Sequence, residues 1–281
     1  MFFVLKGRLL ENEKSLRESE INNGAKIILV GTRDFRVAEG PTKLWTYTKY
    51  GDLTACNLKD IPEELWPCAP FIRILDISCN SLQHVPHRID CFTELRKLFL
   101  KKNDLSDESI SWRGLTSLKL LQVLSLSQNC LNTLPPTLGL LTSLQRLDVA
   151  NNKLTALPIE IGNLTKLEDL QVNNNRISSI PSSIGNRTSL IEALHISNNA
   201  MKSLPNSLFT MCAQLSTLAV HNTEITTDTL LQCEGWEDFE ERRHAECQRR
   251  REEHFNSAEF DELADTIFSY FFRVTDGCSA S

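Results

Sequence analysis

Six asparagines spaced 23 to 26 residues apart constrain the fold of this 281-residue chain more than any other feature. Each lies in the same frame of aliphatic residues, L-x-x-L-x-L-x-x-N-x-L-x-x-L-P-x-x-I-G-x-L, which is complete in residues 144–164. The asparagines are Asn80, Asn103, Asn129, Asn152, Asn175 and Asn199. A period in the twenties on such a frame predicts stacked units that bury their aliphatic residues against one another.

The frame assigns a structural role to each part of one unit. The L-x-L segment predicts a short strand whose leucines point inward and whose x residues point to a concave face. The asparagine amide can satisfy backbone groups at the turn that follows, and successive asparagines can stack into a ladder. Recurring prolines fix φ at the start of a convex segment and exclude a coiled coil. We interpret Gly139, Gly162 and Gly185 as bends between the convex segment and the next strand.

Two flanking segments extend the array to eight units, with Cys56 and Thr223 at the asparagine position. The third unit is longer and lacks the proline, so we expect a bulge on its convex side around Asp107. From about residue 45 to residue 235, the frame resembles that of intracellular leucine-rich-repeat proteins, including the plant Ras-group-related type. The resemblance implies an α/β solenoid of about eight units with a parallel sheet on its concave side.

Composition excludes several classes of partner. The net charge of −6 argues against nucleic acid or an anionic membrane as the main partner. We find no apolar stretch of 18 residues and no signal peptide, and therefore expect a cytoplasmic protein that can also be nuclear. The nine cysteines are scattered without a close pair, which favours reduced thiols over disulfides or a zinc site. We expect no cofactor and no metal.

Residues 2–30 resemble the second half of a ubiquitin-like domain, with strands at the start and at residues 25–30. In that family the last strand pairs with a first strand that this sequence lacks, so we expect residues 25–30 to present an unpaired apolar edge. The resemblance implies that Val4, Ile28 and Val30 match the exposed recognition patch of the family. Plant proteins that join a ubiquitin-like domain to leucine-rich repeats have this layout.

These patterns divide the chain into five segments. They are a partial ubiquitin-like segment (1–35), a linker and N-terminal cap (36–47), leucine-rich repeats (48–227), a C-terminal capping helix (228–254), and an amphipathic helix and tail (255–281). The capping helix is highly charged, and Asp238 with Arg242 has the spacing of an i,i+4 ion pair. Residues 255–274 contain too many acids to span a membrane.

The outward strand positions define a candidate protein-binding face. Its members are Asp76, Lys97, Phe99, Lys101, Arg146, Asp148, Asp169, Gln171, His195 and His221. Phe99 is unusual because it is an aromatic residue at an outward position between Lys97 and Lys101. This combination predicts an apolar anchor with a basic rim, suited to an acidic segment of a partner.

The sequence contains no phosphate-binding loop, zinc-protease motif or nucleophile elbow. The segments outside the repeats are also shorter than a typical catalytic domain. We therefore expect a non-enzymatic scaffold that binds a protein on the concave face, with a link to a ubiquitin-pathway component. Two alternatives stay open: a regulatory subunit in small-GTPase or phosphatase signalling, and a ubiquitin-pathway enzyme with a reactive thiol.

Overall fold

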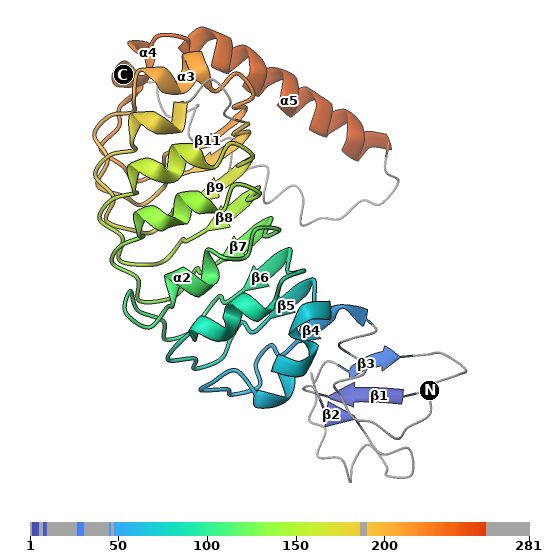
Figure 1. Cartoon of the computed structure of the whole chain (residues 1–281). Coiled ribbons are helices and arrows are strands. Elements are labelled where there is room, and N and C mark those ends of the chain that lie inside the picture. The colour runs from blue at the N-terminus through green and yellow to red at the C-terminus, as the bar shows by residue number, and fades with distance from the viewer. Residues whose placement is uncertain are drawn as a thin grey trace.

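Figure 1 shows the computed structural model, in which the repeats form a curved stack with strands on the concave side and short helices on the convex side. The structure describes residues 2–5, 8–9, 27–30, 45, 48–185 and 190–256. Within the stack, one parallel sheet runs in the order β11-β10-β9-β8-β7-β6-β5-β4. The eight units predicted from the sequence are thereby confirmed.

Each unit contributes one three-residue strand to this sheet. The strands are β4 (Tyr50–Asp52), β5 (Ile74–Asp76), β6 (Lys97–Phe99), β7 (Val123–Ser125), β8 (Arg146–Asp148), β9 (Asp169–Gln171), β10 (Ala193–His195) and β11 (Thr217–Ala219). Their register keeps the central residue of every strand in line, as in Leu98↔Leu124↔Leu147. A position in one unit therefore lies beside the same position in the next.

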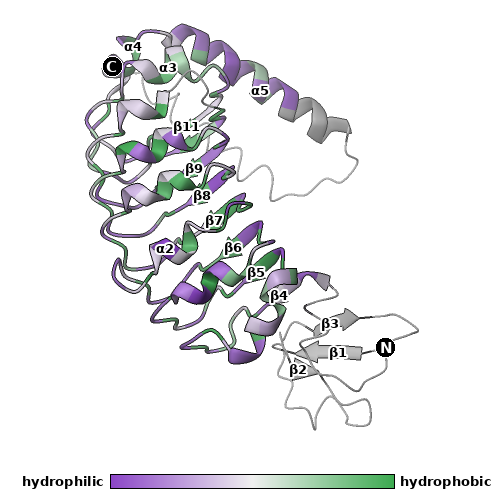
Figure 2. Cartoon of the chain, viewed as in Figure 1, coloured by the Kyte–Doolittle hydropathy of each residue, from purple (hydrophilic) through white to green (hydrophobic). Residues whose placement is uncertain are grey.

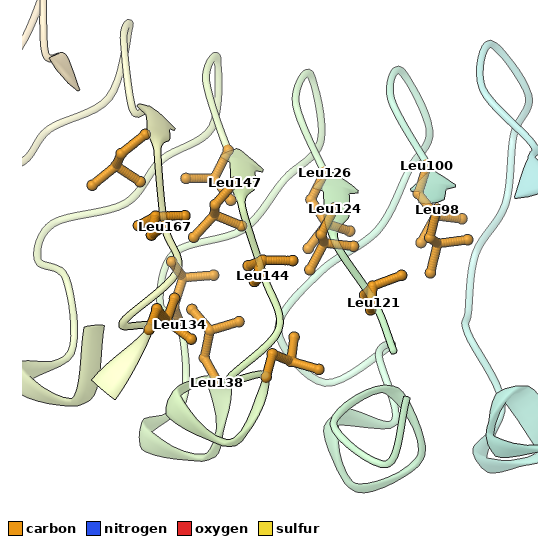
Figure 3. Packing of buried hydrophobic residues seen from close by; sticks show 14 of the residues in the cluster. Leu98, Leu100, Leu121, Leu124, Leu126, Leu134, Leu138, Leu144, Leu147 and Leu167 are labelled. Atoms are coloured by element: carbon orange, nitrogen blue, oxygen red, sulfur yellow. The ribbon is translucent and has the colours of Figure 1, made fainter. Parts of the chain in front are cut away.

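The inward residues form a continuous aliphatic core. Leu98, Leu124 and Leu147 are fully buried, and Figure 3 shows them side by side on successive strands, with Leu138 of a convex helix below them. Complete burial of one leucine side chain contributes about 1.5–3 kcal/mol of transfer free energy. Figure 2 shows polar and apolar residues mixed along the strands and the convex helices, as expected of elements with one buried face.

The convex side carries one short helix per unit. They are η1 (Glu63–Phe71), η2 (His87–Cys91), α2 (Trp112–Leu115), η3 (Pro136–Leu140), η4 (Ile159–Asn163), η5 (Ser182–Gly185), α3 (Ser207–Met211) and α4 (Thr227–Leu231). The prolines of the frame, such as Pro135 and Pro158, are the N-caps of the 3₁₀ helices. An extended residue with fixed φ suits that position.

The recurring glycines have a different role from the one we expected. A Cβ at Gly139 would lie 2.7 Å from the carbonyl oxygen of Glu160, and one at Gly162 would lie 2.4 Å from that of Ser183. Neither glycine has a positive φ. Glycine is therefore needed because the helices of adjacent units approach closely, and not because the chain bends there.

The six asparagines form one row along the turn that follows each strand. The Nδ2 group of Asn152 donates to the carbonyls of Leu126 and Val149 at 3.0 Å, and its Oδ1 accepts from Leu131 N at 3.0 Å. Two of these three partners belong to the preceding unit. The other five asparagines repeat this pattern with Nδ2 bonded to two or three carbonyls, so each side chain joins two units.

The third unit replaces the proline segment with a different connection. Its chain forms an isolated parallel bridge from Ile110 to Val85 before it enters α2. The carboxylate of Asp107 accepts hydrogen bonds from the backbone N–H groups of Asn132 and Thr133 at 2.7 and 3.2 Å. A side chain thus ties this longer segment to the unit that follows it.

The C-terminal end of the array is covered by α5 (Trp236–Asn256). Phe209, Trp236 and Phe239 form an aromatic cluster whose ring centroids lie 5.2 Å apart. The ion pair expected between Asp238 and Arg242 is not the contact observed, because Arg242 donates to the carbonyls of Leu215 (3.1 Å) and Phe209 (3.4 Å). These bonds satisfy acceptors at the exposed end of the stack.

The described N-terminal strands form a separate three-stranded sheet in the order β2-β1-β3. The strands are β1 (Phe2–Leu5), β2 (Arg8–Leu9) and β3 (Ile27–Val30), and both pairings are antiparallel. Within the described residues β3 has a partner on one side only. Val4 pairs with Ile28 and Phe2 with Val30, whereas the side chains of these residues lie outside the description.

Candidate protein-binding face

The register of the sheet arranges the outward side chains in two rows along the concave face. The first row is Tyr50, Ile74, Lys97, Val123, Arg146, Asp169, Ala193 and Thr217. The second row is Asp52, Asp76, Phe99, Ser125, Asp148, Gln171, His195 and Ala219. The candidate residues of the strands therefore share one surface, with Lys101 and His221 just beyond the ends of β6 and β11.

Four cations lie within three residues of Phe99 in the sequence of the third unit, and with it they define the β6 patch. The patch consists of Arg96, Lys97, Phe99, Lys101 and Lys102. All four cations are exposed, and none forms an ion pair with another residue that the structure describes. Phe99 is partly exposed among them. Asp76 of β5 lies beside Phe99 in the second row and offsets part of this charge, which leaves an excess of cations around the ring.

Partly exposed apolar residues extend the β6 patch across the neighbouring strands. Ile74 and Val123 lie on either side of Lys97 in the first row, one in β5 and the other in β7. The carboxylate of Asp76 accepts from Ser78 N at 2.9 Å. The aliphatic side chains and the Phe99 ring can together contact a bulky apolar group of a ligand.

Lys102 has a backbone conformation that asparagine or glycine adopts more easily. Its φ is 56°, in the left-handed region, and the same position in the later units holds Asn151, Asn174, Asn198 and Asn222. For other L-residues this conformation costs roughly 1–2 kcal/mol. Cys79 and Gln128 have the same conformation in the neighbouring units, so it is a property of the turn in every unit.

Tyr50 stands at the N-terminal end of the first row, 37% exposed. Burial, followed by the nearby carboxylates of Asp52 and Asp76, raises the pKa of Tyr50 to about 12. A hydrogen bond from the phenol to the Asp52 side chain contributes as well, so the hydroxyl hydrogen of Tyr50 is used within the fold.

The second half of the concave face is different, because its charged residues bind one another. Arg146 Nε lies 3.0 Å from Asp169 Oδ2, which also accepts from Gln171 Nε2 at 3.0 Å. His195 Nε2 lies 3.9 Å from Asp169 Oδ1, an oxygen that is buried and has no hydrogen-bond partner. One unit earlier, Asp148 accepts from Ser125 Oγ at 2.9 Å.

Burial lowers the pKa of His195 below its ordinary value of 6.5. The carboxylate of Asp169 acts in the opposite direction, and the Arg146 guanidinium adds to the lowering. His221, in the following unit, donates its backbone N–H to Ser197 Oγ at 3.1 Å. Across the described residues, no three His, Cys, Asp or Glu side chains gather in a way that could hold a metal ion.

The sequence analysis missed a second row of asparagines one position before the ladder. Asn222 Nδ2 donates to Asn198 Oδ1, and Asn198 Nδ2 donates to Asn174 Oδ1, both at 2.7 Å. All three residues have φ near 55°, which asparagine tolerates well. The signal was present in the paired asparagines of the later units, whereas Cys79, Lys102 and Gln128 occupy this position in the earlier ones.

The described helices include none that is long and apolar enough to cross a lipid bilayer. The array ends in helix α5, which is rich in charged residues.

Comparisons with known proteins agree with this architecture. A family model described as a leucine-rich repeat region matches residues 71–218. An Arabidopsis thaliana protein named for LRR repeats and a ubiquitin-like domain is 45% identical, over 93% of this chain and 85% of its own length. The plant intracellular Ras-group-related LRR protein 8 of Oryza sativa subsp. japonica is 38% identical, over 93% of this chain and 84% of its own.

Both alignments are longer than the chain itself, at 317 and 319 positions against 281 residues. Each relative therefore has several tens of residues within the aligned region that have no counterpart here. Among solved structures, an internalin from Listeria monocytogenes superposes with a TM-score of 0.57 at 23% identity, covering 70% of this chain and 55% of its own. That likeness shows the fold alone.

Proposed function

Because this chain belongs to the family of leucine-rich-repeat proteins that includes these two plant proteins, we propose that it is a scaffold whose β6 patch binds a client protein. The fold and the names of the relatives point to a repeat protein that binds other proteins rather than to an enzyme. What we propose is the existence of a client protein, and we infer its chemistry from the residues of the patch.

The single observation that carries this proposal is the cluster of unpaired cations around Phe99. The chain as a whole has a net charge of −6, so a local excess of four cations is not a consequence of composition. Exposed cations that bind no internal acid are available to carboxylates of a partner, and their field accelerates its approach. A partly exposed aromatic ring supplies the apolar contact that such interfaces need. The client is therefore an acidic segment with a bulky apolar residue.

We propose further that the N-terminal strands connect this client to the ubiquitin pathway in the cytoplasm. The support for the pathway is the likeness of residues 2–30 to half of a ubiquitin-like domain, together with the printed name of the Arabidopsis relative. The support for the cytoplasm is the word intracellular in the name of the rice relative. In this scheme Val4, Ile28 and Val30 contact the ubiquitin-pathway component, while the β6 patch contacts the client. The two contacts use different parts of the chain and can be tested separately.

The second candidate function is a regulatory subunit in small-GTPase or phosphatase signalling. It is favoured by the rice relative, whose name includes the words Ras-group-related. This role requires the repeats but not residues 1–35. Capture of a GTPase or phosphatase by a variant that lacks residues 1–40 would favour it over the ubiquitin-linked scaffold.

The test of the proposed function is affinity capture from a plant cell extract with the full chain as bait. The double variant Phe99→Ala/Lys101→Ala removes one apolar and one basic side chain of the β6 patch. If both belong to a hot spot worth about 2 kcal/mol, client recovery falls by roughly 30-fold. The variant should unfold at the same urea concentration as the original chain to within about 0.5 kcal/mol, since surface changes have small effects.

The matched control is Lys153→Ala/Ile159→Ala, which removes the same two kinds of side chain away from the concave strands. Lys153 is exposed, and Ile159 is 66% exposed at the start of η4. This control should recover the client at the original level. Equal recovery by the β6 variant and the control would rule out the patch as the client site.

A further inference from the structure

We propose that one side of the array binds a second copy of this chain in a dimer with two-fold symmetry. It is the side on which the chain passes from the convex helices into the strands. This inference goes beyond the proposed function and does not depend on it. The observation that carries it is the order of charged residues along that side, which is complementary to itself when one copy is reversed.

A row of six residues runs along this side, one immediately before each strand from β5 to β10. The backbone N–H of each residue donates to the carbonyl of the equivalent residue in the preceding unit. Gln122 N lies 2.7 Å from Arg96 O, and Gln145 N lies 2.8 Å from Gln122 O. These bonds hold the six residues in line, and we call them the entry row. In order along the array they are Arg73, Arg96, Gln122, Gln145, Glu168 and Glu192.

The entry row changes from basic to neutral to acidic along the array. Two arginines come first, two glutamines follow, and two glutamates come last. A two-fold axis between Gln122 and Gln145 exchanges the first half of the row with the second half. Every cation of the row in one copy then faces an acid of the row in the other. The facing positions are Arg73 with Glu192, Arg96 with Glu168, and Gln122 with Gln145.

The residues beside the entry row follow the same rule in the units of β6 and β9. The corresponding segments of these two units are Glu94-Leu95-Arg96-Lys97 and Lys166-Leu167-Glu168-Asp169. The leucine is buried in both segments, whereas the other three residues have opposite charges at each position. The proposed axis places these two units opposite each other. Each charge of one segment therefore faces its opposite in the other copy.

Three further cations lie on this side among the described residues, and none of them meets a like charge. Lys119 donates to two carbonyls of its own copy, at 2.9 and 3.3 Å, and faces Thr142. Arg146 is bound to a carboxylate of its own copy at 3.0 Å and faces a valine of β7. Lys49, before β4, faces Ser216, before β11. The three aspartates of the second row likewise correspond to residues without negative charge, which are Ala219, His195 and Phe99.

Apolar side chains are exposed on the same side of the array. Leu120, two residues before Gln122, is 42% exposed, and Leu140, at the end of η3, is 52% exposed. They belong to adjacent units on either side of the proposed axis, so a dimer brings leucines of both copies together near its centre. Phe71, 51% exposed, corresponds to the partly exposed Leu190. Burial of these side chains supplies the apolar contribution that exposed ion pairs lack.

In a single copy, the same order places like charges side by side. Arg73 stands next to Arg96, and Glu168 stands next to Glu192, each pair in adjacent units. Like charges at such positions destabilise a sheet. Local partners offset part of this repulsion, because Arg73 lies 4.0 Å from Glu94 and Glu168 accepts from a glutamine of the row at 3.2 Å. The opposite charges of a second copy would offset the rest.

The position of the entry row suits a contact between two curved arrays. The row lies between the convex helices and the strands, on one side of the arc in Figure 1 and not in its hollow. A two-fold axis through the middle of this side lays one arc on the other with the same direction of curvature and the units reversed. The row spans five strand spacings, or about 24 Å at ~4.8 Å each. Phe99, Lys101 and Lys102 lie at or beyond the far end of β6 and stay accessible to a client.

The experiment is sedimentation equilibrium of the full chain at roughly 0.1 M salt and at up to about 100 μM protein. We expect the apparent mass to rise with concentration from 31.9 kDa toward twice that value. Raising the salt to about 1 M should weaken the dimer, because the Debye length falls from ~10 Å to ~3 Å. An apparent mass that stays at 31.9 kDa over the whole range would overturn the inference.

Two charge-reversal variants make the test specific to the entry row. Glu168→Arg/Glu192→Arg leaves only cations among its charged residues, and Arg73→Glu/Arg96→Glu leaves only acids. Each change should raise the dissociation constant of the homodimer at least about 100-fold, because like charges then face each other. An equal mixture of the two variants should form a heterodimer, since a basic row then faces an acidic one. The chain with all four changes should dimerise by itself.

The matched control is Lys153→Glu/Arg176→Glu, which reverses two exposed cations in the loops that follow β8 and β9. It changes the net charge as much as the acidic variant does, and it should keep the original dissociation constant. Net charge alone does not weaken both row variants, because one makes the chain less negative and the other makes it more negative. Urea denaturation of each variant checks that it is folded.

The outcomes separate this inference from the proposed function. A dimer that persists in both row variants is formed by another surface and would overturn the inference, as would a mixture of the two that stays monomeric. Glu168→Arg/Glu192→Arg leaves the β6 patch unchanged, so it should lose the dimer and keep its client. If the chain dimerises as expected and Phe99→Ala leaves client recovery unchanged, the client site alone is wrong.

Discussion

The two halves of the concave sheet are built from the same repeat but differ in how their charged side chains are used. In the second half, Arg146, Asp169 and Gln171 bind one another, and the asparagines beyond the strands form their own hydrogen-bonded row. In the first half, Arg96, Lys97, Lys101 and Lys102 form no ion pair with a residue that the structure describes, and Lys102 has a left-handed φ of 56°.

The comparison separates positions whose side chains stabilise the array from positions whose side chains are free to bind a partner. Asparagine fills this left-handed position in four later units, whereas Cys79, Lys102 and Gln128 fill it in three earlier ones with the same backbone geometry. Lys102 differs from the residues at this position in the other units by its positive charge, and it forms no ion pair with a residue that the structure describes. Its charge is therefore available to a partner.

The prediction with the largest expected effect tests whether the asparagine ladder stabilises both halves of the sheet. Asn103→Ala in the first half and Asn152→Ala in the second each remove a side chain that bonds to buried backbone groups of two units. Each should lower the free energy of unfolding by about 3 kcal/mol or more, because buried groups are left unsatisfied. Urea denaturation measures both. A loss at only one site would show that the two halves are held together differently.

The second test uses pH to separate the halves. Burial lowers the pKa of His195 in the folded chain, so the unfolded chain takes up its proton first as the pH falls. The stabilisation is complete above about pH 6.5 and declines as the pH falls from there through the lower folded-state pKa. His195→Gln should flatten the stability profile over this range, because glutamine does not titrate there. Identical profiles for His195→Gln and the original chain would contradict the assignment.

The smallest test places an asparagine where the first half lacks one. Lys102→Asn should raise the free energy of unfolding by about 0.5–1 kcal/mol, since asparagine tolerates the left-handed φ better than lysine. The same change should lower client recovery, because it removes one cation of the β6 patch. Gln128→Asn, at the equivalent position of the next unit, is the control and should stabilise without affecting the client. If Lys102→Asn leaves the free energy of unfolding unchanged or lowers it, the backbone of Lys102 is not strained.

Sequence reasoning anticipated those features that repeat with every unit. The alternation within each strand and the constant period determine which residues face outward, so Phe99 and Lys97 could be assigned to the concave face from the sequence. The number of strands followed from the same pattern, with Cys56 and Thr223 at its two ends.

Features that depend on distances between units could not be predicted from the sequence. The pairing of Arg146 with Asp169 joins residues 23 positions apart whose side chains could equally have faced solvent. Gly162 looked like a bend because the sequence does not show how close the carbonyl of Ser183 comes. Arg242 prefers two carbonyls to Asp238 because the last unit exposes unsatisfied acceptors that helical spacing alone does not reveal.

The reach of each ladder asparagine has a consequence for how such chains change length. Asn103 and Asn152 bond only within their own unit and the one before, so no hydrogen bond of the ladder skips a neighbour. A whole unit can therefore be inserted or lost in the interior while every surviving junction closes as before. Homologous arrays are free to evolve in modular steps, each step moving the two ends of the molecule apart or together by one increment of the stack.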